Sequence, residues 1–187
     1  MSERGLYTTV DGRPAVRFER RLPHPVEAVW RALTDPSELE HWFPHPIAIE
    51  ALRLGAVVRI DDPRGILHSE IAELEPARRL AFRWGTDLLR FELAPADGGT
   101  LLTMTQVLEG EGERAAAKMA AGWHLCLDAL ARCLDGAPVA AGPCGVTPQW
   151  RVEYDAYVAD GLPSGADVSG LSERPRRRAA PAARARR

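Results

Sequence analysis

Apolar and polar side chains alternate along much of the first 108 residues, and a period of two is typical of half-buried β-strands. In one such stretch, Leu80, Phe82 and Trp84 share a face. Short connections with turn residues, such as the Asp-Gly-Gly sequence at 97–99, favour antiparallel neighbours. The strands that this pattern predicts are residues 13–22, 47–52, 55–60, 66–74, 79–84, 88–93 and 100–108.

Two short helices are predicted after the first strand, because the apolar spacing there changes from two residues to three or four. The first helix follows Pro25, which suits a first turn, where its missing N–H is not needed. Asp35 is a good N-cap for the second helix, with Pro36 and Glu38 at its first and third positions. The second helix ends before Pro44. The apolar stripe of the first helix consists of Val26, Val29, Trp30 and Leu33.

The longest amphipathic pattern spans residues 111–134 and predicts one long helix that stops before Gly136. Its apolar side chains are Met119, Trp123, Cys126, Leu127, Leu130, Cys133 and Leu134. The segments around the strands and helices contain many glycines, prolines and polar residues. They are expected to be a flexible start (1–12), a linker with a short helix at 149–159 (137–160) and a disordered, arginine-rich tail (161–187).

This order of elements predicts an α+β fold with a single domain over residues 13–136. A curved antiparallel sheet of about six to seven strands has one apolar face, and the long C-terminal helix is the element that covers it. Where sheet and helix do not close completely, an apolar cavity remains, and such cavities are common ligand sites.

The charges are divided unevenly along the chain. Of the 24 basic and 26 acidic residues, seven arginines and one glutamate lie in residues 171–187, which leaves 17 basic and 25 acidic side chains in residues 1–170. We expect the tail to be solvated, with nucleic-acid contact that is at most non-specific. No apolar run reaches the length of a membrane span, and the N-terminus lacks the apolar core of a secretory signal. A cytoplasmic location is therefore expected.

The usual catalytic and metal-binding motifs are missing from the sequence. Cys126 and His124 are two positions apart in the long helix, so they point to different faces. His41 and His45 have the spacing of a helical metal pair, but Pro44 interrupts the helix between them. We therefore expect no catalytic residue, no metal and no cofactor.

Ten side chains are predicted to line the cavity. For His68 and Glu70 the alternative is an outward polar face, because a shift of one residue in register exchanges the two faces of a strand. Phe91, Met104 and Trp123 would otherwise be plain core. Trp42 and Phe43 form either a lid at the cavity mouth or an anchor of the short helix. The ten are Trp42, Phe43, His68, Glu70, Trp84, Phe91, Met104, Met119, Trp123 and Leu127.

Two segments carry a family resemblance. The sequence PHPVEAVWRALTDP at 23–36, followed by Leu39 and Trp42-Phe43, resembles bacterial proteins similar to the activator of the heat-shock-protein-90 ATPase. Gly122-Trp123 resembles the start of their closing helix. That family belongs to the START-like, or birch-pollen-allergen-like, superfamily (SRPBCC). The resemblance implies a helix-grip fold with a pocket and no shared catalytic motif.

Three functions follow as hypotheses. The first is binding of a small apolar or amphipathic molecule in the cavity between sheet and helix. The second, carried by the family's namesake, is regulation of a chaperone ATPase or interaction with another protein partner. The third is a cyclase- or aromatase-like enzyme, which would need an ionisable group inside the cavity.

Overall fold

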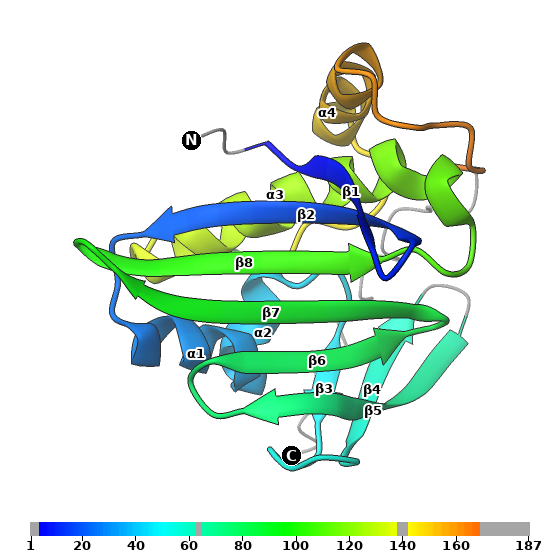
Figure 1. Cartoon of the computed structure of the whole chain (residues 1–187). Helices are drawn as coiled ribbons and strands as arrows, with labels where there is room; N and C mark the ends of the chain where they lie inside the picture. The colour runs from blue at the N-terminus through cyan, green and yellow to red at the C-terminus, as the bar shows by residue number, and fades with distance from the viewer. Residues whose placement is uncertain (1–3, 63–64, 138–141, 169–187) are drawn as a thin grey trace, which may run out of the picture.

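The computed structural model describes residues 4–62, 65–137 and 142–168. Within these residues, eight antiparallel strands form one curved sheet (Figure 1), in the order β1-β2-β8-β7-β6-β5-β4-β3. The strands are β1 (Leu6–Val10), β2 (Arg13–Leu22), β3 (Ile47–Ile49), β4 (Val57–Asp62), β5 (Gly65–Glu75), β6 (Arg79–Trp84), β7 (Asp87–Ala96) and β8 (Gly99–Val107).

The register of the central strands places large side chains in a row. Met104 on β8 pairs with Phe18 on β2 and with Phe91 on β7. Residues that pair directly across antiparallel strands point to the same face of the sheet. All three side chains are at most 2% exposed, so this row lies in the hydrophobic core.

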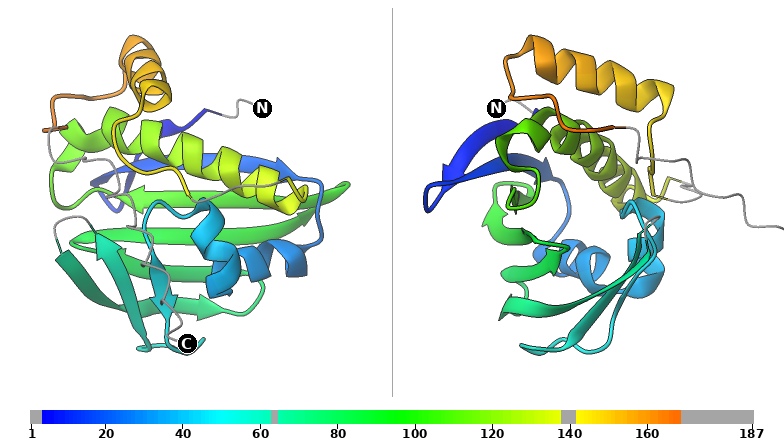
Figure 2. Two further views of the ribbon diagram at one scale, coloured as in Figure 1. Left: turned by 180° about the vertical axis from the view of Figure 1, so that it is seen from behind. Right: turned by 90° about the vertical axis from the view of Figure 1, so that its right-hand side faces the viewer.

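The helices cover the inner face of the sheet. Figure 2 shows α1, α2 and α3 on the same side of the sheet, with α4 on the outer side of α3. The helices are α1 (Val26–Thr34), α2 (Pro36–Trp42), the 3-10 helix η1 (Gly112–Ala115), α3 (Ala116–Leu134) and α4 (Pro148–Ala159). The predicted helix-grip architecture is therefore confirmed, with both short helices after β2 and the long helix near the C-terminal end.

Helix caps lie where the sequence predicts them. The Asp35 carboxylate accepts a hydrogen bond from the Ser37 backbone N–H at 2.9 Å, and the hydrogen bonds from Ser37 lower the pKa of Asp35. Helix α3 ends at Leu134, and Gly136 follows with a positive φ of 73°. Glycine adopts that backbone conformation without a steric penalty, which explains the stop.

The flexible start expected for residues 1–12 is wrong for Leu6–Val10, which pairs with β2 as strand β1. The connection consists of Asp11 and Gly12, with φ angles of 50° and 75°. Two consecutive positive φ values are typical of the tight turns that join hairpin strands, and Asp-Gly is a favoured pair for them. With β1 the described sheet has eight strands, whereas the sequence predicted about six to seven.

The disordered tail expected from residue 161 is also wrong at its beginning, because the structure describes residues 161–168 packed along the start of α3. The Ala117 N–H donates to the Pro163 carbonyl at 2.9 Å, and the Ala166 N–H donates to the Arg114 carbonyl. The first N–H groups of a helix have no partner within it, so this segment supplies one. The rest of the predicted tail (169–187), like residues 138–141 of the linker, lies outside the described residues.

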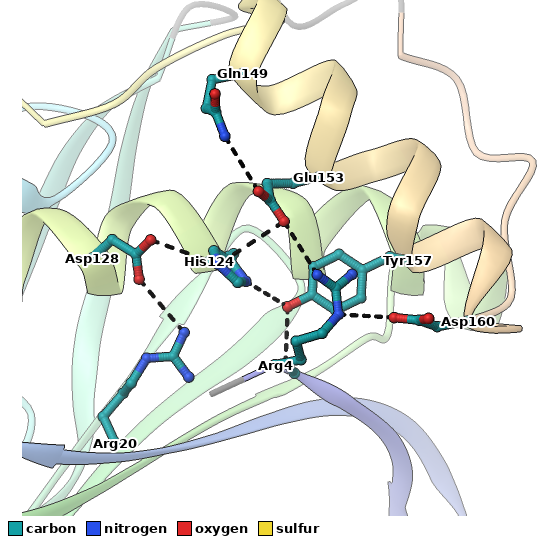
Figure 3. A network of polar contacts seen from close by, with 9 residues as sticks. Arg4, Arg20, His124, Asp128, Gln149, Glu153, Tyr157 and Asp160 are labelled. Carbon is teal, nitrogen blue, oxygen red and sulfur yellow. Dashed lines mark hydrogen bonds and ion pairs between the residues drawn. The ribbon is translucent and has the colours of Figure 1, made fainter. Parts of the chain in front are cut away.

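A polar cluster fastens the N-terminal segment and α4 to the outer face of α3 (Figure 3). The buried Tyr157 hydroxyl accepts a hydrogen bond from the Gly5 N–H at 2.8 Å and lies 2.9 Å from Nδ1 of His124. The Arg4 guanidinium lies over the Tyr157 ring and bonds Asp160 at 2.8 Å. Burial raises the pKa of Tyr157, so its hydroxyl remains protonated at neutral pH.

We predict that Tyr157→Phe lowers the free energy of unfolding by about 1–3 kcal/mol, because it leaves the Gly5 N–H without its buried acceptor. Hydrogen exchange at Gly5 should become faster. The matched control is Tyr154→Phe on the same helix, whose ring stacks on Trp150 and whose hydroxyl lies outside this cluster. Urea unfolding and amide exchange test this prediction, and equal effects of the two variants would contradict it.

Candidate ligand cavity

Aromatic side chains fill the space between the middle of the sheet and α3. The Phe43 ring centroid lies 5.5–5.7 Å from those of Trp42, Trp84 and Trp123. Trp42 and Phe43 are both fully buried, and the Trp42 indole N–H donates to the Ala32 carbonyl at 2.8 Å. The two rings therefore anchor α2 in the core, and the interpretation of Trp42-Phe43 as a lid is wrong.

A cavity of about 320 Å³ lies at one end of this aromatic cluster. The first half of α3 forms one wall, and the adjoining ends of β4, β6, β7 and β8 form another. The rim is completed by residues 44–45, Glu111, residues 143–145, Thr147, Trp150 of α4 and Asp167. This volume is at the lower end of the range for small-molecule sites, about 300–1,000 Å³.

Three of the ten predicted cavity residues line the cavity: Trp84, Met119 and Trp123. Five others are core side chains that do not reach it: Trp42, Phe43, Phe91, Met104 and Leu127. His68 and Glu70 are exposed on β5 and pair with the exposed Arg59 and Val57 of β4. The outward polar face is therefore correct for these two residues, and their assignment to the cavity is wrong.

A continuous hydrogen-bonded chain runs along the sheet wall of the cavity. The Trp123 indole N–H donates to Oε1 of Gln106 at 2.6 Å, and Nε2 of Gln106 donates to Oδ2 of Asp87 at 2.7 Å. The other Asp87 oxygen accepts the backbone N–H groups of Glu109 and Gly110 at 2.9 and 3.1 Å. Because Gln106 and Trp123 are at most 3% exposed, these bonds satisfy groups that water does not reach.

Lys118 is the buried cation of the cavity wall, with 8% of its surface exposed. Its ammonium donates to the Glu111 carboxylate and to the Asp167 backbone carbonyl, both at 2.8 Å. A charge removed from water requires such partners. The bond from Lys118 to the Asp167 carbonyl also connects the segment after α4 to the first turn of α3.

Two thiols line the cavity in different environments. Cys126 is fully buried, and burial strongly raises the pKa of its thiol, which makes it unreactive at neutral pH. The Sγ atom of Cys144 lies 3.6 Å from Nδ1 of His45, whose ring is edge-on to Trp84. His124 belongs to the polar cluster of α4, so it forms no pair with Cys126, as expected.

Sequence reasoning missed the polar residues of the cavity. Gln106 had a detectable signal, because it shares the inward face of its strand with Leu102 and Met104 and a polar group there needs a buried partner. His45 and Cys144 lie in irregular segments, where no periodicity places a side chain. The other polar residues that were missed are Asp62, Asp87, Glu111, Lys118, Thr147 and Asp167.

The described part of the chain contains no group of three or more side chains placed to hold a metal ion. None of its helices has the length and hydrophobicity of a membrane span.

The comparison with protein families identifies the chain. A model described as "Activator of Hsp90 ATPase homolog 1-like protein" matches residues 23–135, more than half of the sequence. The chain belongs to this family. No curated protein matches the chain. The expected family resemblance, which rested on residues 23–36 and on Gly122-Trp123, is thus confirmed.

Solved structures of other proteins share the fold of this chain. The conserved protein of unknown function EF2215 from Enterococcus faecalis is 22% identical, with a TM-score of 0.66 over 83% of this chain and 91% of its own. CalU16 from Micromonospora echinospora is 22% identical, with a TM-score of 0.63 over 82% and 92%. At these identities the likeness shows the fold alone.

DynU16, described as a putative protein in the dynemicin biosynthetic locus, is 33% identical, with a TM-score of 0.57. The match covers 66% of this chain and 48% of DynU16. This chain therefore spans about half the length of DynU16.

We predict that Trp42→Ala lowers the free energy of unfolding by about 3–5 kcal/mol, because it empties a fully buried site and removes a hydrogen bond. Leu54→Ala, at a position that is 61% exposed, should change it by less than about 0.5 kcal/mol. Urea unfolding of both variants tests the core assignment. A small loss in Trp42→Ala would restore the lid interpretation.

Raising the pH from 8 to 10 should lower the free energy of unfolding by about 2 kcal/mol through Cys126 alone. The unfolded thiol titrates near pH 8.5, whereas burial raises the pKa of the folded thiol, so stability is lost as the pH rises past the unfolded value. Urea unfolding under reducing conditions at both pH values measures this loss. In Cys126→Ala the drop should be smaller by that amount, and an identical drop would refute the prediction.

Proposed function

We propose that this protein binds a small amphipathic molecule in the cavity between α3 and the ends of β6, β7 and β8. The observation that carries the proposal is the cavity itself, which combines tryptophan and aliphatic walls with a few polar groups in fixed orientations. Such a combination is the usual character of a small-molecule site. The apolar part of the ligand would lie against Met119, Leu125 and Cys126 of α3.

Membership of the family supports this proposal through the shared fold. The location of DynU16 in a biosynthetic locus is a property of DynU16 and is not transferred to this chain. A cyclase-like enzyme is the second candidate, because ionisable side chains do line the cavity, among them Asp87, Lys118 and His45. Regulation of a chaperone ATPase, which the family's name describes, would need a protein surface instead of an occupied cavity.

The test is native mass spectrometry of the protein purified from its own host. We expect a non-covalent adduct of defined mass that is lost on denaturation. Gly122→Leu should abolish the adduct, because Gly122 faces the cavity from mid-helix and has room for a side chain: a Cβ there would meet Trp150 at 3.9 Å. Arg132→Leu, an exposed position on the same helix, is the matched control and should retain it.

The outcomes separate the candidate functions. An adduct that is released unchanged supports a binding protein, whereas an adduct that is converted to product supports an enzyme. The proposal would be overturned in favour of a protein partner by two results together. The natural protein would carry no adduct, and the natural protein and Gly122→Leu would change the ATPase rate of a chaperone to the same extent.

A further inference from the structure

Several polar groups of the cavity wall are bonded to one another. The Trp123 indole and the Gln106 amide are bonded along the wall, and the Lys118 ammonium is bonded to Glu111 and to the Asp167 carbonyl. Carboxylate and carbonyl oxygens keep further lone pairs when they have accepted one bond. Asp87 can therefore accept a further hydrogen bond, which suits a ligand whose polar group donates.

The charge of the wall points the same way. Asp87 and Glu111 are carboxylates of the cavity lining, and Glu111 is paired with Lys118. Asp87 is decisive, because in the described structure its hydrogen bonds come from neutral donors, the Gln106 amide and two backbone N–H groups. These bonds fix the position of the carboxylate without cancelling its negative charge.

Aromatic rings surround the same space. Trp84 and Trp123 meet edge to face with centroids 5.9 Å apart, and the His45 ring contacts Trp84 from the other segment of the rim. Trp150 closes the cavity from α4. The faces of tryptophan rings carry partial negative charge and attract cations, most strongly where water is excluded.

We propose that the ligand is an amphipathic amine, whose protonated nitrogen binds between the tryptophan rings and the Asp87 carboxylate while its apolar body lies against α3. This inference rests on the proposed function, since it names the ligand class of the same cavity. An anionic ligand would face the Asp87 charge, and the Lys118 ammonium already bonds Glu111 and the Asp167 carbonyl. A neutral apolar ligand would make no use of the Asp87 charge.

The test uses three probes with the same phenylbutyl body and different heads: 4-phenylbutylamine, 4-phenylbutan-1-ol and 4-phenylbutanoate. Isothermal titration calorimetry with the full chain at pH 7 and low salt gives the three dissociation constants. We expect the amine to bind at least tenfold more tightly than the carboxylate, with the alcohol between them. Added salt should weaken the binding of the amine alone. Gly122→Leu should abolish binding of all three probes.

A charge-removing variant locates the effect. Asp87→Asn keeps an acceptor oxygen but removes the charge, so the amine should weaken to the level of the alcohol, whose own binding should stay within twofold. Asp155→Asn, exposed on α4, is the matched control and should change neither. Thermal unfolding shows whether Asp87→Asn is folded, and the ranking of the probes on the natural protein decides the matter if it is not.

The results distinguish this inference from the proposed function on which it rests. If the alcohol or the carboxylate binds as tightly as the amine, the amine preference is overturned while ligand binding stands. If none of the probes binds at millimolar concentration, both the inference and the proposed cavity function fail for ligands of this size.

Discussion

The packing around Phe43 is the interaction on which the rest of the structure depends. Its ring lies between the end of α2, the sheet and α3, in contact with Trp42, Trp84 and Trp123. Because Trp84 and Trp123 also line the cavity, one aromatic cluster is both part of the core of the domain and the floor of the cavity. Rings held on one side by close packing keep their orientation on the side that faces the cavity.

A second constraint follows from burying a tryptophan. The Trp123 N–H needs an acceptor, Gln106 provides it, and the amide of Gln106 then needs Asp87. Each hydrogen bond satisfies one buried group and orients the next side chain. The series of bonds ends on the Asp87 carboxylate, which accepts two backbone N–H groups. The need to satisfy buried groups thus places the Asp87 carboxylate in the cavity wall, and the ligand preference proposed above rests on that position.

The sequence was sufficient for the periodic parts of the fold and insufficient for the site. Residues 79–84 and the long helix are confirmed because period-two and 3.6-residue patterns report burial directly. The pattern missed β1, a short strand for which the main sequence signal is the Asp11-Gly12 turn. It also failed for the cavity, since Phe91 and Trp123 have similar patterns and only close packing in three dimensions decides which one borders empty space. His45 and Cys144 come from irregular loops, where position depends on tertiary contacts.

The segment after α3 is part of the site as well as a covering for the helix. The family match ends at residue 135, yet Cys144, Trp150 and Asp167 all line the cavity. The same segment binds the start of α3 through Pro163 and Lys118, so it is held in place by bonds that the helix terminus would otherwise lack. The family portion of the chain therefore supplies the aromatic floor and the Asp87 wall. The extension supplies part of the rim, and its Trp150 and Tyr157 side chains also belong to the hydrophobic core.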